Sequence, residues 1–181
     1  MKIDSRPVQW IGAALILGWA GFIALGLPQI AAAVPNEAAT EAGTPVTVGG
    51  VTITPSECWS LPKDVSEILI LRKAGSQLTA LPPAPATGDA TSILAPLVEP
   101  LRQDPNVTWN LGDPQPFTTA SGASGAYVVA LAPQQFVTNY VVVQDGQSTQ
   151  VIVTGTDADW TSLHEEILNM VKTVAIAGGG S

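Results

Sequence analysis

Cysteine and histidine are almost absent from this chain of 181 residues, which contains one of each, Cys58 and His164. A single cysteine excludes a disulfide within the chain and every fold that depends on several disulfides. One cysteine and one histidine are also too few for a zinc site built on the usual ligands. The sequence therefore predicts no metal site and no disulfide framework.

Charged side chains are scarce as well, because Asp, Glu, Lys and Arg make up only 12% of the residues. That is about half their usual share. The 15 acidic residues outnumber the 7 basic ones, which gives a formal net charge of -8. An acidic chain is repelled by polyanions, so we expect no nucleic acid among its partners. No Lys or Arg lies between Gln103 and Val171, and the acids of that stretch predict an electronegative surface.

One long apolar run stands near the N-terminus, where residues 7–36 carry no charge. Its centre, Trp10–Leu27, would span about 27 Å as a helix, close to the thickness of the hydrocarbon core. Lys2 and Arg6 precede the run, and Glu37 and Glu41 follow it. The positive-inside rule then places the N-terminus in the cytoplasm and the larger part of the chain outside. We therefore expect a single-pass protein of the cell membrane, in contact with the lipid bilayer.

The small residues Ala14, Gly18 and Gly21 would let a second helix approach this span closely. A cleaved signal peptide is the alternative, since Ala31-Ala32-Ala33 fits an A-x-A cleavage site. The apolar run exceeds the 7–15 residues usual for the core of a signal peptide, which favours a retained anchor. The expected organisation is a cytoplasmic N-terminus (1–7), a transmembrane anchor (8–34), a linker (35–45), an extracytoplasmic domain (46–176) and a flexible tail (177–181).

The remainder predicts a domain of strands and two helices. Residues 46–53 alternate around Gly49-Gly50, as two short strands or one bulged strand. Further strands are expected at 57–62, 67–72, 76–81, 107–111, 126–131, 139–144 and 147–154. A helix is expected over 89–103, capped by Asp89 or Thr91, although Pro100 should kink or end it. The residues around Pro114 and Pro116 are expected to form a loop.

The C-terminal third carries the strongest local signals. Asp145-Gly146 is a strong two-residue hairpin signal between two apolar runs. Thr156 and Asp159 can form a capping box at the start of the last helix. The apolar residues of that helix recur at spacings of three and four, which indicates one buried face. We expect these side chains in the core: Trp59, Trp109, Trp160, Leu163, Ile167 and Val171. The order of elements predicts an α+β fold, an antiparallel sheet with helices packed on it.

This pattern also resembles a known family. The residues that carry the resemblance are V-x-V-GG-V-x-I-T-P, then CWSLP, ILIL, SGASGAYVV, the Asp-Gly hairpin and MVKTV, between Val46 and Val174. It resembles membrane-anchored or secreted actinobacterial proteins with a PsbP-like α/β/α sandwich. Many members have Gly where this chain has Cys58. The resemblance implies a non-enzymatic accessory or docking domain, with no catalytic residue to transfer.

The side chains that could carry chemistry do not form a recognisable site. His164 lies beside the apolar face of the last helix, which favours a histidine at the edge of the core, and no G-x-S-x-G motif supports a nucleophile. Asp157 and Asp159 suit a helix N-terminus without a ligand. Cys58 next to Trp59 is expected to be a small buried side chain, although pairing with another chain stays open. We predict no catalytic, cofactor-binding or metal-binding residue.

Three functions follow, in order of preference. The first is an accessory subunit that docks on or stabilises a larger integral membrane protein complex, with a respiratory-chain supercomplex or the cell-envelope lipid-transport machinery as candidates. The second is a module that binds a lipid or another small ligand between sheet and helices. The third is a hydrolase of unknown substrate.

Overall fold

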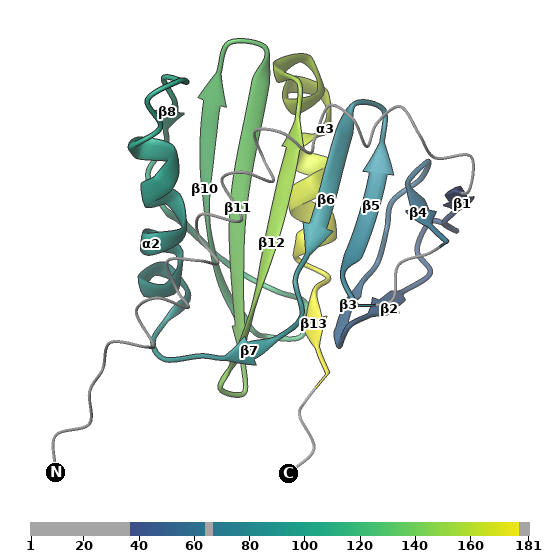
Figure 1. Cartoon of the computed structure of the whole chain (residues 1–181). Coiled ribbons are helices and arrows are strands. Elements are labelled where there is room, and N and C mark those ends of the chain that lie inside the picture. The colour runs from purple at the N-terminus through teal and green to yellow at the C-terminus, as the bar shows by residue number, and fades with distance from the viewer. Residues whose placement is uncertain (1–36, 64–66, 178–181) are drawn as a thin grey trace, which may run out of the picture. The chain divides into compact units, whose positions relative to one another are not determined.

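A ten-stranded antiparallel sheet organises the domain (Figure 1). The computed structural model describes residues 37–63 and 67–177. Across the sheet the strands follow the order β1 (Glu37–Ala39), β4 (Ser60–Pro62), β5 (Leu69–Lys73), β6 (Ser76–Ala80), β12 (Gln147–Gly155), β11 (Gln135–Gln144), β10 (Ser124–Ala132) and β8 (Asn110–Leu111). Two short strands lie off this path: β7 (Ala84–Pro85) pairs with β12, and β9 (Gln115–Thr118) pairs with β10.

A second sheet consists of β13 (Ala175–Ile176), β3 (Val51–Ile53) and β2 (Val46–Val48). Gly49 and Gly50 join β2 to β3 with φ angles of 58° and 82°, a region that glycine enters without steric cost. A Cβ atom at Gly49 would also collide with the backbone oxygen of Glu67. The predicted pair of short strands with a Gly-Gly turn is confirmed, and both glycines have a structural reason.

The predicted Asp-Gly hairpin connects β11 to β12. Asp145 and Gly146 have φ angles of 50° and 73°, as a two-residue turn with both central residues at positive φ requires. The turn sets a register in which Tyr140 lies opposite Val151, and β10 continues the row with Tyr127. Side chains alternate between the faces of a strand, so this register decides which residues enter the core.

Two hydrophobic clusters cover opposite faces of the main sheet. Adjacent residues of β11 show this, since side chains alternate between the faces of a strand and these residues belong to different clusters. Val142 faces the larger cluster and Val141 the smaller one. The larger cluster lies under α3 (Asp157–Val171) and the second sheet. The smaller one lies under α2 (Ala90–Arg102). The predicted α+β fold, with an antiparallel sheet and helices packed on it, is confirmed.

Helix α2 continues through both of its prolines. Pro96 and Pro100 lie inside the helix, which ends only at Arg102, so of the two expectations for Pro100, a kink or an end of the helix, the end is wrong. Each proline removes one backbone hydrogen bond, whereas burial of Leu94 and Val98 against β10 and β11 holds the helix on the sheet. The predicted cap is confirmed: Asp89 accepts a hydrogen bond of 2.7 Å from the Ser92 amide, and this bond lowers the pKa of Asp89.

Helix α3 begins as its sequence indicates. Thr156 and Asp159 form the reciprocal capping box, which confirms that prediction. The buried side chains of the helix are Leu163, Ile167, Met170 and Val171. Neither helix of the described part has the length and hydropathy of a membrane span. The predicted anchor at 8–34, with Ala14, Gly18 and Gly21, lies outside the described residues.

The range 35–45, expected to be a linker, contains a strand of the main sheet. Residues Glu37–Ala39 form β1, which pairs with β4 in the register Glu37 opposite Pro62. The pairing continues past the strand, since the Thr40 amide donates to the carbonyl oxygen of Trp59 at 2.9 Å. The linker prediction is wrong for these residues, because a three-residue edge strand has too little periodicity to be seen in the sequence.

Several short elements also differ from expectation. Residues Gln115–Thr118, expected in a loop, form β9, and the strand expected at 107–111 is reduced to β8. Proline is tolerated in β9 because this strand lies at the edge of the sheet, where Pro116 faces Ala126. The strand expected at 57–62 begins only at Ser60. Strand β13 follows α3 and was not expected.

Candidate functional site

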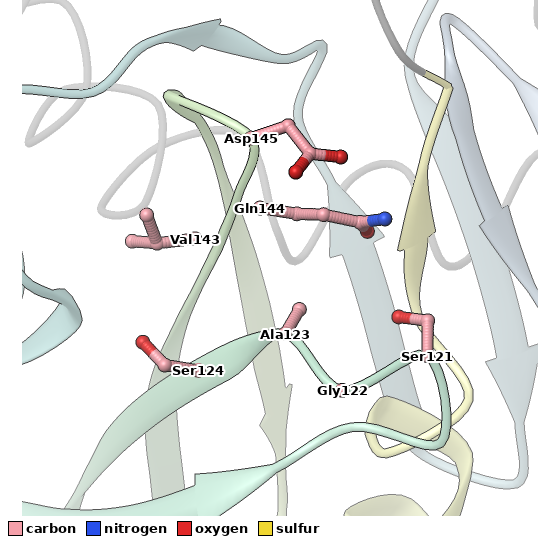
Figure 2. A pocket seen from close by; sticks show the side chains of 7 residues that line it. All are labelled: Ser121, Gly122, Ala123, Ser124, Val143, Gln144 and Asp145. Carbon is pink, nitrogen blue, oxygen red and sulfur yellow. The ribbon is translucent and has the colours of Figure 1, made fainter.

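A polar hollow of about 250 Å³ opens where β10 begins and β11 ends (Figure 2). The residues that line it are Ser121, Gly122, Ala123, Ser124, Val143, Gln144 and Asp145. The two segments are adjacent because Ser124 lies opposite Val143 in the register of β10 and β11. Figure 2 shows the side chains of Gln144 and Asp145 extending from the end of β11 toward the side where Ser121 lies.

The first wall of the hollow is a turn closed around Thr119. The Thr119 amide donates to the Ala123 carbonyl at 3.0 Å, and the Gly122 amide donates to the Thr119 carbonyl at 2.9 Å. The Thr119 hydroxyl, which is buried, accepts a 3.0 Å hydrogen bond from the Ala123 amide. It also lies 2.9 Å from the hydroxyl of Ser121. These bonds hold the turn in one conformation and leave Ser121 exposed at the hollow.

The second wall is the tip of the β11–β12 hairpin. The Oε1 atom of Gln144 accepts a 3.1 Å hydrogen bond from the Ile176 amide of β13, which orients the side-chain amide. Asp145 is exposed, and within residues 37–63 and 67–177 its carboxylate takes part in no ion pair. The hollow thus presents a carboxylate, an oriented amide and the hydroxyl of Ser121, while the Ser124 side chain extends to the opposite side of the strand (Figure 2).

A polar cluster of a different kind joins α3 to the sheet. Glu166 accepts a 2.7 Å hydrogen bond from the indole nitrogen of Trp59. Its two carboxylate oxygens also accept hydrogen bonds of 2.8 and 2.9 Å from Lys73 Nζ. Lys73 Nζ donates a further bond to the carbonyl oxygen of Glu57 at 2.9 Å. Every polar group here has a protein partner, so the cluster acts as a structural link between α3, β4 and β5.

A second ion pair holds the edge strand β1. Glu37 accepts hydrogen bonds from the Ser60 hydroxyl at 2.6 Å and from Arg72 Nη1 at 3.1 Å. The Ser60 hydrogen bond and then the Arg72 guanidinium hold the pKa of Glu37 below its ordinary value. The side chain of Glu37 therefore stays ionised and fastens the first strand to β4 and β5.

The three tryptophans expected in the core have different environments. Trp59 is fully buried. Trp160 is half-buried against the larger cluster, with its ring 5.0 Å from that of Phe136 and 5.3 Å from that of His164. Trp109 belongs to neither cluster, so its prediction as a core residue is wrong. It follows the Asp104–Asn106 turn, and its indole nitrogen lies 3.4 Å from Asp104.

The remaining candidate residues are not brought together. Leu163, Ile167 and Val171 are buried in the larger cluster. His164 is exposed, and its Nδ1 atom lies 3.1 Å from the carbonyl oxygen of Trp160. Within the described part of the chain, no group of three or more His, Cys, Asp or Glu side chains could hold a metal ion.

Cys58 is exposed, which corrects the expectation that it is buried. Its φ angle is 64°, because the chain turns here just before it enters β4. Glycine adopts that conformation most readily, so the backbone at Cys58 is one that favours glycine. The turn directs the thiol to solvent while the next residue, Trp59, enters the core.

Sequence reasoning did not single out the hollow. Asp145-Gly146 forms the predicted turn, and Ser121 and Gly122 form a second turn that leads into β10 at Ser124. No signal in either segment shows that the two turns meet, because their proximity depends on the pairing of β10 with β11. The only local feature that points to a site is Gln144, a polar residue next to a tight turn.

Comparison with known proteins yields similar folds and no family. No family model matches the chain, and no curated protein matches it. The crystal structure of LpqN, which is involved in cell envelope biogenesis of Mycobacterium tuberculosis, has a TM-score of 0.53 at 14% identity, covering 78% of this chain and 91% of LpqN. The solution structure of the cyanobacterial PsbP from Synechocystis has a TM-score of 0.49 at 10% identity, covering 80% of this chain and 95% of that one. This domain therefore has the fold of LpqN.

Proposed function

We propose that this protein is a non-enzymatic accessory subunit, anchored in the cell membrane by residues 8–34. Its domain lies outside the cytoplasm and docks on a larger integral membrane protein complex. The observation that carries the proposal is the uncharged run of residues 7–36, which leads into a folded domain at Glu37. A membrane anchor fused to a small domain is suited to association with other membrane proteins.

The short connection supports this role. Only Pro35 and Asn36 lie between the proposed span and β1 in the sequence, since Glu37–Ala39 of the expected linker form a strand. An anchor raises the effective concentration of the domain for partners in the same membrane, so a modest interface suffices. LpqN, which shares the fold, is involved in cell envelope biogenesis, and we extend that setting to this chain. The envelope lipid-transport machinery and a respiratory-chain supercomplex are the partner complexes proposed.

The alternative of a lipid held between sheet and helix has less support. The larger cluster places fully buried side chains such as Leu78, Val153 and Ile167 between the main sheet and α3. A lipid there would have to displace them. We therefore treat ligand binding as an outcome of the experiment below.

We expect a membrane-impermeant maleimide to label Cys58 in intact cells. This residue is the only cysteine of the chain and is exposed, so the reagent reports the side of the membrane on which the domain lies. The labelled band should retain the mass of the full chain. A Cys58→Ser variant is the control for background. Labelling only after permeabilisation would place the domain in the cytoplasm, and a labelled chain that lacks residues 1–33 would show a cleaved signal peptide.

Co-purification from native membranes tests the accessory role. The tagged full chain should retain a multi-subunit complex in stoichiometric amount, as seen by mass spectrometry. Replacing Ala14 and Gly18 with Leu should weaken that retention, because larger side chains prevent close helix approach. The matched control is Ile16→Leu with Ile23→Leu, which keeps the hydropathy of the span.

Three other outcomes are informative. Full retention by the Ala14→Leu, Gly18→Leu variant would refute a role for the anchor helix and leave docking to the domain alone. A monomer that carries lipid would select the ligand-binding alternative. A monomer that carries nothing would refute the accessory role.

A further inference from the structure

The hollow between the 121–124 turn and the β11–β12 hairpin has no part in the role proposed so far. We propose that it receives the guanidinium group of an arginine side chain from the partner protein. This inference rests on the proposed function for the existence of a protein partner. The chemistry of the hollow can be tested without that partner.

The lining offers acceptors at several angles. Among the described residues that line the hollow, Asp145 is the only charged one, and its carboxylate is exposed. The hydroxyl of Ser121 adds an acceptor at the other wall, whereas the Ser124 side chain extends to the opposite side of the strand together with Val143 (Figure 2). A guanidinium carries five N–H donors in a planar fork and bonds a carboxylate through two of them. An ammonium group is a more strongly hydrated point charge and gains less from acceptors spread over two walls.

The hollow exists before any ligand arrives. The turn is closed by the backbone and hydroxyl bonds of Thr119, and the Gln144 amide is oriented by Ile176. Asp145 belongs to a two-residue turn whose backbone is set by the strand pairing on both sides. Groups that are already ordered lose little conformational entropy on binding, so a small set of polar contacts can provide specificity.

The charge of the chain favours the same ligand. The acidic excess gives a net charge of -8; no Lys or Arg lines the hollow, and Lys172 meets the adjoining turn through its backbone carbonyl, which accepts a hydrogen bond from the Ala120 amide. A negative surface attracts a basic partner and speeds its association. An arginine directed at Asp145 would then fix the orientation of the two proteins relative to each other.

The experiment uses two small probes and the full chain in detergent micelles. N-acetyl-arginine methylamide and its citrulline counterpart have nearly the same shape, but citrulline carries a neutral urea in place of the guanidinium. We expect the arginine probe to shift the amide resonances of residues 121–124 and 143–146 in a saturable way. The citrulline probe should bind about fivefold more weakly, as expected for a partly exposed ion pair.

Asp145→Asn should weaken binding of the arginine probe by the same factor. Asparagine tolerates a positive φ angle, so the hairpin turn is kept. The matched control is Asp113→Asn, which removes one charge from another exposed position outside the hollow and should leave binding unchanged. No saturable shift at these residues, equal affinity for the two probes, or equal weakening by both variants would each overturn the proposal.

Co-purification separates this inference from the proposed function. With the complex retained by the wild-type chain, Asp145→Asn should reduce its recovery severalfold and Asp113→Asn should not. Retention of the complex by Asp145→Asn would refute the arginine contact while the accessory role stands. Absence of any complex with the wild-type chain would refute the accessory role, and the arginine titration would still decide the chemistry of the hollow.

Discussion

The Ile167→Ala variant should lose about 2–5 kcal/mol of the free energy of unfolding, as buried Ile-to-Ala changes do. Ile167 has no exposed surface and lies between α3 and the main sheet. Removal of its outer carbons leaves a cavity that the neighbouring strands, paired on both sides, cannot close. Urea denaturation followed by circular dichroism would measure the change as a lower midpoint.

The matched control lies two residues earlier on the same helix. Glu165 is exposed, and a Glu165→Ala change should alter the stability by no more than about 0.5 kcal/mol. Equal midpoints for Ile167→Ala and the parent protein would show that α3 does not pack through this face. A loss in the Glu165→Ala variant as large as that of Ile167→Ala would point to general sensitivity of the helix.

Loss of the Glu166 carboxylate should also destabilise the domain, by about 1–3 kcal/mol. The Glu166→Ala change removes the acceptor of the buried Trp59 indole and the partner of Lys73 together. A buried donor left without an acceptor costs its full desolvation energy. The same denaturation experiment measures this loss against Glu165→Ala, which removes a neighbouring charge of the same sign.

A Glu166→Gln variant separates the two contributions. Its amide oxygen can still accept from Trp59, whereas the ion pair with Lys73 is lost. We expect a smaller loss than with alanine, because partly exposed ion pairs contribute only about 0–1 kcal/mol. If Glu166→Ala proves as stable as Glu165→Ala, the contact between α3 and the β4–β5 edge makes no net contribution to stability.

At the edge of the sheet, the sequence pattern no longer predicts which residues form a strand. Strand β1 is three residues long, and its partner β4 lies more than twenty positions later in the chain. A strand was expected around β4, but the segment of β1 has too little alternation to indicate a strand by itself. The pairing with β4, the hydrogen bond and ion pair of Glu37 with Ser60 and Arg72, and the bonds from Thr40 to Trp59 show why the chain is held there. A linker was therefore the natural interpretation of a small, polar segment.

The exposure of Cys58 illustrates a second limit. Its neighbour Trp59 is buried, but Cys58 itself lies in a turn and has a positive φ angle, which composition does not reveal. The prediction that Trp109 lies in the core is wrong for a related reason, because an aromatic ring can cover a turn as well as fill a core.

Local chemistry let the sequence by itself determine the antiparallel hairpin at Asp145-Gly146, the caps of both helices at Asp89 and Thr156, and the α+β order of elements. The hairpin turn and the caps depend on residues within four positions of one another, and the order of elements follows from the local pattern of each segment in turn, so the signal and the structure coincide. Tertiary structure alone decided that Glu37 begins a strand, that Cys58 faces solvent and that Ser121 and Asp145 line one hollow. Those outcomes depend on which strands pair. Pairing is stabilised by the burial of side chains on both faces of the sheet, and segments that are distant in the sequence contribute those side chains together.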